Sequence, residues 1–432
     1  MNLLAAGSQI FSSRLLQVAA NATVVLLVAD RLGPAGQGYY SLTLAVVMVA
    51  AAILNGGVGL AAVPDLRQGR VVPSRMLRAQ AVWVAGVTAF LVLALVVLRG
   101  TSLAALAGER LGWTGSIAIA AGVAVLALVV FDIVNYDLLA IGRLVVGAGV
   151  NLARALTHLV LVTALAVLVG LKLGTAVTAF AAAQIVAAIV LVILLKRSRV
   201  VADPAVVQSP PLGLLALVGR NLRRGWVGQV SVVAYLLMLR LDQGLVAHYH
   251  GAEVVGIYSL AVWAGEMLWL IPGALTPLLV HSSAGVDEPE RDITAARAVR
   301  VGLLLTLTAA VPVALVAPFV FRYLAGGVYA GASSALWALL PGIVVVAPAT
   351  VLAGDFIGRG RPAWNAQASS LVVIAGVILG LWLIPDHGAV GAAWASSLSY
   401  TLGTVLMVVR FRKVTGLSLR EILIPGRADL RH

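Results

Sequence analysis

The sequence has 432 residues, of which 61% are hydrophobic and only 11% are charged, with a formal net charge of +13. Charged residues make up about a quarter of a soluble domain, so this composition excludes a soluble globular protein. The chain has no cysteine, which excludes disulfide bonds and thiolate metal sites within it. We predict no cofactor.

Twelve long apolar stretches follow one another along the chain. A helix needs about 20 apolar residues to cross the hydrocarbon core of a membrane, so we predict an all-α polytopic membrane protein. The first stretch lacks a basic leader and a convincing cleavage site, and we expect it to be retained. The predicted spans cover residues 8–29, 38–63, 77–98, 115–139, 145–169, 174–195, 219–241, 254–280, 299–321, 330–353, 364–384 and 389–409.

Lys and Arg fall mainly in alternate loops. With both termini in the cytoplasm, the inner loops and the C-terminal tail carry 22 of the 30 Lys and Arg residues, and the outer loops carry five. This asymmetry predicts cytoplasmic termini, and we expect the bacterial inner membrane as the location. Attraction to anionic membrane lipids accounts for the remaining basic character, so no nucleic-acid partner is predicted.

Three short motifs occur twice. The pattern G-x4-G-x-Y-S-L is found at two positions 218 residues apart, and two weaker matches have offsets of 216 and 214. Such self-similarity predicts an internal repeat. The matching segments are 33–42 with 251–260, 141–143 with 357–359, and 174–181 with 388–395.

The repeat predicts two homologous lobes of six helices each. Prolines at positions 204, 210 and 211 interrupt helical structure between them. Parallel repeats of this kind occur in transporters, in which the pathway lies between the halves. The expected parts are an N-lobe at 1–198, a cytoplasmic linker at 199–218, a C-lobe at 219–412 and a basic cytoplasmic tail at 413–432.

Several of these strings carry a family resemblance. LGPAGQGYYSL at 32–42, D-x5-H-x-H-G-x4-G-x-YSLA at 242–261, Pro272 with Pro277, and D-F-I-G-R-G at 355–360 resemble the polysaccharide-transporter branch of the multidrug/oligosaccharidyl-lipid/polysaccharide exporter (MOP) superfamily. The resemblance covers roughly residues 8–412.

The resemblance implies two lobes around a central cavity. It also implies a flippase that moves a polyprenyl-diphosphate-linked oligosaccharide from the inner to the outer leaflet for cell-surface polysaccharide synthesis. The partners would be this lipid-linked glycan, membrane lipids, and a polysaccharide polymerase or glycosyltransferases.

Polar side chains recur on one face of three predicted spans. A charge at mid-bilayer costs about 2.5–3.5 kcal/mol on insertion scales, so it should face protein or water. Because a guanidinium stays charged and forms forked hydrogen bonds to phosphate, we predict substrate binding by these faces; each Arg could instead reach a headgroup or neutralise a carboxylate. The candidates are Arg14, Gln17 and Asn21 in the first span, Asn151, Arg154 and His158 in the fifth, and Arg224, Tyr235 and Arg240 in the seventh.

Three carboxylates within the spans are candidates for ion coupling: Asp132, Asp242 and Glu266. A buried carboxylate can take up a proton or a sodium ion and link a gradient to the conformational cycle. The alternative for Asp132 and Glu266 is a static ion pair with one of the arginines.

Other functions remain as alternatives. A multidrug cation antiporter of the same superfamily needs an acidic cavity, whereas these polar faces hold at least as many arginines as carboxylates. A membrane enzyme or a structural membrane protein is a further reading. His248 and His250 form a metal-like pair in a short outer loop without a third ligand, and we find no phosphate-binding or hydrolase motif, so we predict no enzyme.

Overall fold

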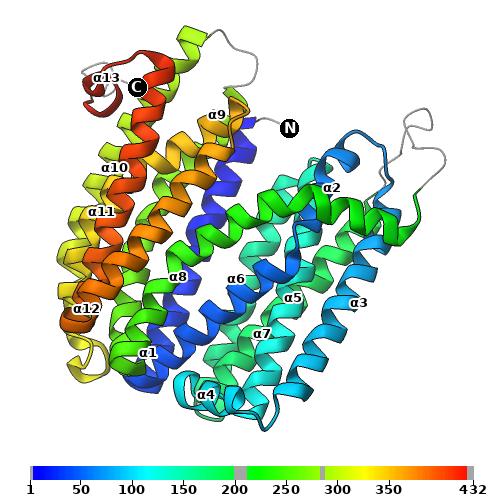
Figure 1. Ribbon diagram of the computed structural model, residues 1–432. Coiled ribbons are helices and arrows are strands. Elements are labelled where there is room, and N and C mark those ends of the chain that lie inside the picture. The colour runs from blue at the N-terminus through cyan, green and yellow to red at the C-terminus, as the bar shows by residue number, and fades with distance from the viewer. Residues whose placement is uncertain (1–2, 199–211, 283–287, 426–432) are drawn as a thin grey trace. The chain divides into compact units, whose positions relative to one another are not determined.

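The computed structural model describes residues 3–198, 212–282 and 288–425, and all regular secondary structure in these residues is helical (Figure 1). The predicted all-α fold is therefore confirmed. Residues 199–211 of the predicted linker and 426–432 of the predicted tail lie outside the described residues. The helices are α1 (Leu3–Asn55), α2 (Val58–Arg67), α3 (Pro73–Leu98), α4 (Ser102–Leu111), α5 (Gly115–Ala140), α6 (Leu144–Leu168), α7 (Leu173–Arg197), α8 (Leu214–Glu266), η1 (Met267–Trp269), α9 (Leu270–Ser282), α10 (Glu288–Tyr323), η2 (Leu324–Gly327), α11 (Ala332–Gly358), α12 (Ala363–Thr415) and α13 (Leu419–Leu423).

Three helices, α1, α8 and α12, are each 53 residues long. A straight helix of this length would extend about 80 Å, whereas the hydrocarbon core is about 30 Å thick. Each of the three contains one glycine with non-helical backbone angles, at Gly33, Gly251 and Gly388 respectively. Each long helix is therefore two helices joined at a glycine.

Nine helices in the described part of the chain are long and apolar enough to cross a membrane. Because three of the nine contain two spans each, the count agrees with the twelve predicted spans. The structure shortens three predicted loops, around residues 30–37, 242–253 and 385–388, to a bend at a single glycine. The chain is thus a multi-pass membrane protein.

Two short helices were not expected from the sequence. Helix α4 lies in the predicted outer loop between the third and fourth spans, and Thr101 caps it by accepting a hydrogen bond from the backbone N–H of Ala104. The end of the predicted span 38–63 is wrong: the long helix ends at Asn55, because Gly56 and Gly57, both with positive φ, break it before α2 begins at Val58. A ten-residue helix such as α2 or α4 is too short to appear in a search for membrane spans.

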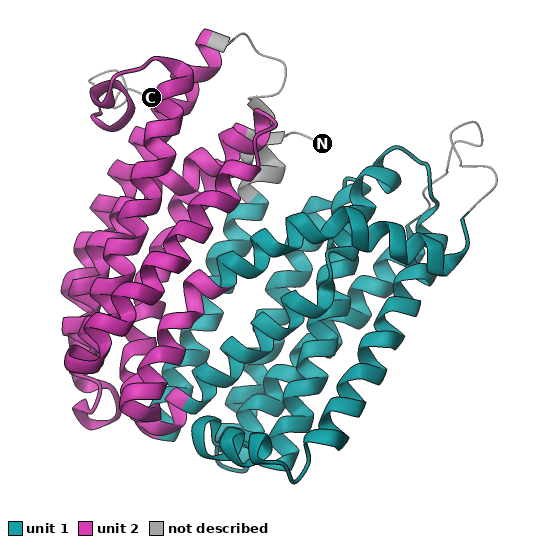
Figure 2. Ribbon diagram, in the orientation of Figure 1, with its two compact units in different colours: residues 1–32, 39–236 teal, residues 33–38, 237–432 magenta. Residues whose placement is uncertain are grey.

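Contacts along the chain define two compact units (Figure 2). Unit 1 comprises residues 1–32 and 39–236, and unit 2 comprises 33–38 and 237–432. The first part of α8, 214–236, therefore packs with unit 1, although the sequence repeat assigns it to the C-lobe. The homology of two lobes of six helices remains a prediction.

Small residues fill the cores of both units. In unit 1, α5 and α7 bury alanines such as Ala124 and Ala176, and in unit 2, α10 and α11 bury alanines such as Ala295 and Ala347. Small side chains let helices approach closely in a membrane, where lipid is as apolar as Leu and burial alone gives little driving force.

The repeated G-x4-G motif has a specific geometry in unit 2. Gly33 and Gly251 have nearly the same backbone angles, with φ/ψ of 68°/−179° and 78°/−177°, a region open essentially only to glycine. A methyl group on Gly38 would lie 1.8 Å from the carbonyl oxygen of Ala252, and one on Gly256 would lie 1.9 Å from that of Pro34. Since Ala252 is the repeat counterpart of Pro34, this backbone contact is reciprocal.

The second repeated motif has a different register from the one its letters suggest. Gly142 and Gly360 both have positive φ, and each donates a backbone hydrogen bond to the residue three before it. The turn residues are thus 218 apart, as in the first motif, and the offset of 216 for I-G-R is wrong as a structural register. Two fully buried aspartates, Asp137 and Asp355, become repeat counterparts by this correction.

We predict that Gly256→Ala destabilises the protein by about 3 kcal/mol or more, the upper range for overpacking, because its methyl group would meet backbone that cannot turn aside. Gly244→Ala is the control: it lies in α8 before the bend at Gly251, with no atom within 4 Å of an added methyl group, and alanine should leave stability unchanged or raise it by about 0.5–1 kcal/mol. The measurement is the monodisperse fraction after heating in detergent. Equal stability of the two variants would contradict the backbone contact.

Candidate functional site

Helix α6 presents the predicted polar face of unit 1. Arg154 donates hydrogen bonds to Oε1 of Gln184 on α7 and to Oδ1 of Asn151, both at 3.1 Å. Its guanidinium lies 4.4 Å from the ring centre of Phe131 on α5, a cation–π distance. Asn151 also donates to the carbonyl of Gly147 at 3.0 Å. Arg154 is thus held rigidly by neutral partners.

Asp132 on α5 provides the negative charge nearest to this arginine. The two groups interact electrostatically, but they form no ion pair within 4.0 Å. Hydrogen bonds to neutral amides do not cancel the charge of a guanidinium. Arg154 therefore retains a positive field that a phosphate oxygen could use.

His158 lies one turn further along α6 and belongs to the packed interior. Its Nε2 lies 3.1 Å from the hydroxyl of Tyr40, and its ring meets that of Phe180 edge-on at 5.4 Å. The side chain is 6% exposed. Its partner Tyr40 is the tyrosine of the first G-x4-G-x-Y-S-L motif.

In unit 2, two of the predicted residues pair with each other. Nη1 of Arg240 lies 2.8 Å from Oε1 of Glu266, and Nη2 lies 3.2 Å from Oε2. This forked arrangement is the strong form of an ion pair, and each side chain is only 19% exposed. The contacts match the alternative of a static ion pair for Glu266.

Asp242 has a different environment, made of neutral donors. Its carboxylate accepts hydrogen bonds from the hydroxyl of Tyr258 at 2.5 Å, from Oγ of Ser396 at 3.1 Å and from the backbone N–H of Gln243 at 2.7 Å. A small cavity of about 20 Å³ borders Asp242, Ser396 and Ser399. It is large enough for a water molecule or a bare cation.

Sequence reasoning missed the hydroxyl groups around Asp242. Tyr258 is the tyrosine of the second G-x4-G-x-Y-S-L motif, so its recurrence was an available signal. Ser396 and Ser399 lie in the serine-rich part of α12 that follows Gly388. Nothing in the sequence marks these serines as partners of a residue 154 positions away.

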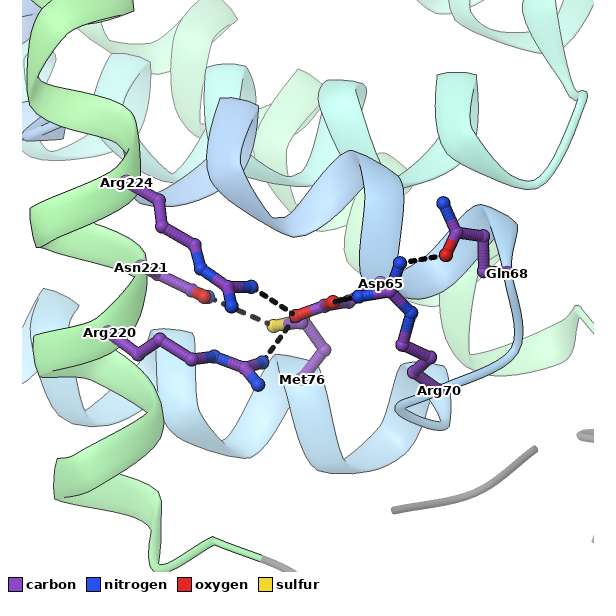
Figure 3. A network of polar contacts seen from close by, with 7 residues as sticks. All are labelled: Asp65, Gln68, Arg70, Met76, Arg220, Asn221 and Arg224. Carbon is purple, nitrogen blue, oxygen red and sulfur yellow. Dashed lines mark hydrogen bonds and ion pairs between the residues drawn. The ribbon is translucent and has the colours of Figure 1, made fainter.

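Arg224 belongs to an ion-pair network around Asp65 (Figure 3). Asp65 on α2 is fully buried and pairs with Arg70, at 3.3 Å, and with Arg220 and Arg224 of α8. Arg224 is the most distant partner, at 3.7 Å, and its side chain is 52% exposed. It helps to compensate the charge of a buried carboxylate that the sequence analysis did not single out.

Residues 214–236 of α8 form further contacts within unit 1. Gly57 and Gly225 touch backbone to backbone, since a methyl group on either would lie 2.1–2.4 Å from the other's carbonyl oxygen. Asn221 donates to Sδ of Met76 at 3.4 Å, and Gln229 donates to the carbonyl of Ala52 at 2.5 Å. Residues 214–236 are therefore an integral part of unit 1.

The remaining predicted residues join neither cluster. Arg14 is exposed, and Gln17 and Asn21 are half-buried on α1. Tyr235 is 45% exposed on α8. The structure brings Asp132, Asn151, Arg154 and His158 together in unit 1, and Arg240, Asp242 and Glu266 together in unit 2. No cluster of three or more metal-ligating side chains occurs in the described part of the chain.

Comparisons with known proteins agree with this fold. No family model and no curated protein sequence matches the chain. An inward-facing multidrug resistance MATE transporter of the MOP superfamily superposes with a TM-score of 0.73 at 16% identity, over 93% of this chain and 94% of that one. The lipid II flippase MurJ, in an inward closed conformation, gives 0.72 at 12% identity, over 97% and 89%.

A third structure comes from Pyrococcus furiosus. It is a MOP superfamily transporter with a binding pocket of reversed polarity, and it superposes with a TM-score of 0.66 at 14% identity, over 95% of this chain and 94% of its own. The chain therefore shares the twelve-helix fold of these transporters. Its membership of the MOP superfamily, and of the polysaccharide-transporter branch, remains a prediction.

We predict that Glu266→Gln lowers the stability of the protein by about 3 kcal/mol, the lower end of the range for buried pairs, because Arg240 would lose its counter-charge. Glu253→Gln makes the same chemical change at an exposed position of α8 and should be neutral. Thermal unfolding of both variants in one detergent tests whether Glu266 is the counter-ion of Arg240. An unchanged melting temperature for Glu266→Gln would exclude the counter-ion role.

Proposed function

We propose that the protein is an alternating-access flippase of the bacterial inner membrane that moves a polyprenyl-diphosphate-linked oligosaccharide to the outer leaflet. The fold it shares with MurJ and MATE transporters supports a transport function. The motifs that resemble the polysaccharide-transporter branch support a glycan carried on a lipid diphosphate.

The observation that carries this proposal is the environment of Arg154. The guanidinium is preorganised by Gln184, Asn151 and Phe131 without a direct carboxylate partner. An arginine that only stabilised the fold would be expected to form an ion pair, as Arg240 does with Glu266. Arg154 is instead available for a diphosphate, which keeps its negative charge and accepts forked hydrogen bonds.

Asp242 is the residue that we propose for ion coupling. It is surrounded by hydroxyl and amide donors and borders a small cavity, so a proton or a sodium ion can be bound and released there without breaking a forked ion pair. Glu266 is less suited to this role because Arg240 already occupies both of its oxygens.

The second candidate is a multidrug cation antiporter. Asp242 and Asp132 favour it, since neither forms an ion pair with an arginine in the described part of the chain and a carboxylate of this kind can bind an organic cation. One of the superposed MATE transporters is a multidrug resistance transporter by its name. The two candidates differ in the charge of the substrate.

We expect Arg154→Ala to reduce flipping of a fluorescent lipid-linked oligosaccharide in liposomes by tenfold or more, since a charge-assisted hydrogen bond is worth about 1.5–3 kcal/mol. Arg154→Lys should recover only part of the rate, because an ammonium keeps the charge and loses the fork. Arg143→Ala, at the exposed start of the same helix, is the control.

Full flipping by a folded Arg154→Ala protein would remove Arg154 from the substrate site. If the wild-type protein exports a fluorescent organic cation and does not flip the glycan lipid, the second candidate replaces the first.

The charge asymmetry of the loops predicts cytoplasmic termini. Reporter fusions placed after Gly170 and after Asp386 should show activity on the outer side of the membrane, because both positions follow an odd-numbered span. A stable fusion at either position with a cytoplasmic signal would contradict the proposed topology.

A further inference from the structure

Asp137, near the C-terminal end of α5, is fully buried, and the only hydrogen-bond partner of its carboxylate in the described residues is neutral. Nε2 of Gln80 on α3 donates to its Oδ1 at 3.0 Å. Gln80 is itself 1% exposed. Isolated burial of an ionised carboxylate is costly unless a cation or several donors compensate it.

Two acceptor atoms of this pair lack a donor. Oδ2 of Asp137 and Oε1 of Gln80 are both buried without a hydrogen-bond partner among the described residues. Reversing the amide of Gln80 would not help, because its oxygen would then face the carboxylate oxygen. One additional hydrogen is what the pair needs. A carboxylic acid has that hydrogen, since its protonated oxygen is a donor.

Asp355, the repeat counterpart of Asp137, is compensated in another way. It is also fully buried near the end of its helix, and Nε of Arg359 lies 2.5 Å from its Oδ2. Arg359 also pairs with Asp292 at 2.6 Å. The same position of the repeat is therefore ion-paired in unit 2 and lacks a cation in unit 1.

Charged side chains on the elements packed against α5 are directed elsewhere. Asp65 of α2 pairs with arginines, Arg75 of α3 donates to the carbonyl of Leu212, and Arg154 of α6 bonds Gln184 and Asn151. His158 of α6 contacts Tyr40. The remaining cations on or beside these elements are exposed: Arg67, Arg78, Arg143, Lys196 and Arg197.

We propose that Asp137 is a proton-binding site, a carboxylic acid that carries its proton in this conformation and pairs through it with Gln80. No sequence feature singled out this residue for ion coupling. Ionisation would leave an uncompensated charge between α3 and α5, so release of the proton requires these helices to admit water. A part in proton-linked transport rests on the proposed function, whereas the protonated state does not.

The test is infrared spectroscopy of the purified full-length protein at neutral pH, for which no substrate is needed. The carbonyl band of a protonated carboxylic acid should be present in the wild type and absent in Asp137→Asn. Asp355→Asn is the matched control. It should retain the band, since Asp355 is ion-paired with Arg359 and therefore ionised, so that its removal leaves the acid of Asp137 unchanged. A wild-type spectrum without a band that Asp137→Asn removes would overturn the proposal.

A second variant covers poor folding of Asp137→Asn. Gln80→Met keeps the shape of the side chain and removes the hydrogen-bonding amide, so the acid band should persist and move to higher frequency. An ionised Asp137 would show no band in this variant, which would also overturn the proposal.

The pH dependence of stability provides an independent measurement. Because folding favours the neutral acid here, its stabilising effect is complete at low pH and is lost as the pH rises through the titration of the folded protein. The melting temperature of the wild type should therefore fall relative to that of Asp137→Asn as the pH is raised. A constant difference between weakly acidic and mildly alkaline pH would contradict a protonated Asp137, because the two variants should diverge from the titration of an unfolded aspartate up to that of the folded protein. If the wild-type protein shows the carboxylic acid band but does not flip the glycan lipid, only the proposed function is refuted.

Discussion

A close backbone contact in unit 2 depends on the absence of two side chains. Gly38 and Gly256 allow the segments that follow Gly33 and Gly251 to touch through their peptide groups, and any larger residue would force them apart. Gln37 donates to Oγ of Ser259 at 3.3 Å beside this contact. In a membrane, where burial of apolar surface provides little driving force, such backbone contact is a main source of packing energy.

This contact explains why the sequence repeat is strongest at G-x4-G-x-Y-S-L. The first glycine provides the backbone angles that end one span and start the next, the second provides the contact, and the tyrosine is buried in both copies. Residues elsewhere in the repeat are constrained only to be apolar and small, so their letters diverge. A motif aligned by its letters alone can therefore be displaced from the structural register, as I-G-R is by two residues.

The sequence was sufficient for the number and position of the spans, because hydrophobic length is a property of each segment by itself. It was also sufficient for the face of α6, since a spacing of three and four residues places Asn151 and Arg154 together. The sequence could not predict which side chains contact each other across different helices. Arg240 pairs with a residue 26 positions away and Asp65 with one 155 positions away, and helical periodicity carries no information about which faces meet.

The buried side chains at matching positions of the sequence repeat have different partners in the two units. Tyr40 contacts His158, whereas its counterpart Tyr258 donates to Asp242. Asp137 meets an amide and its counterpart Asp355 meets a guanidinium. The backbone geometry is the same at both positions because it determines how the helices bend and pack. The side chains that contact these residues can differ, because each contact involves only one side chain. The proposed transport function would require such differences, since binding and release of a substrate and a coupling ion need groups whose charges are not all permanently compensated. Among the buried and half-buried carboxylates described above, Asp242 in unit 2 and Asp132 and Asp137 in unit 1 form no ion pair with a cation of the described residues.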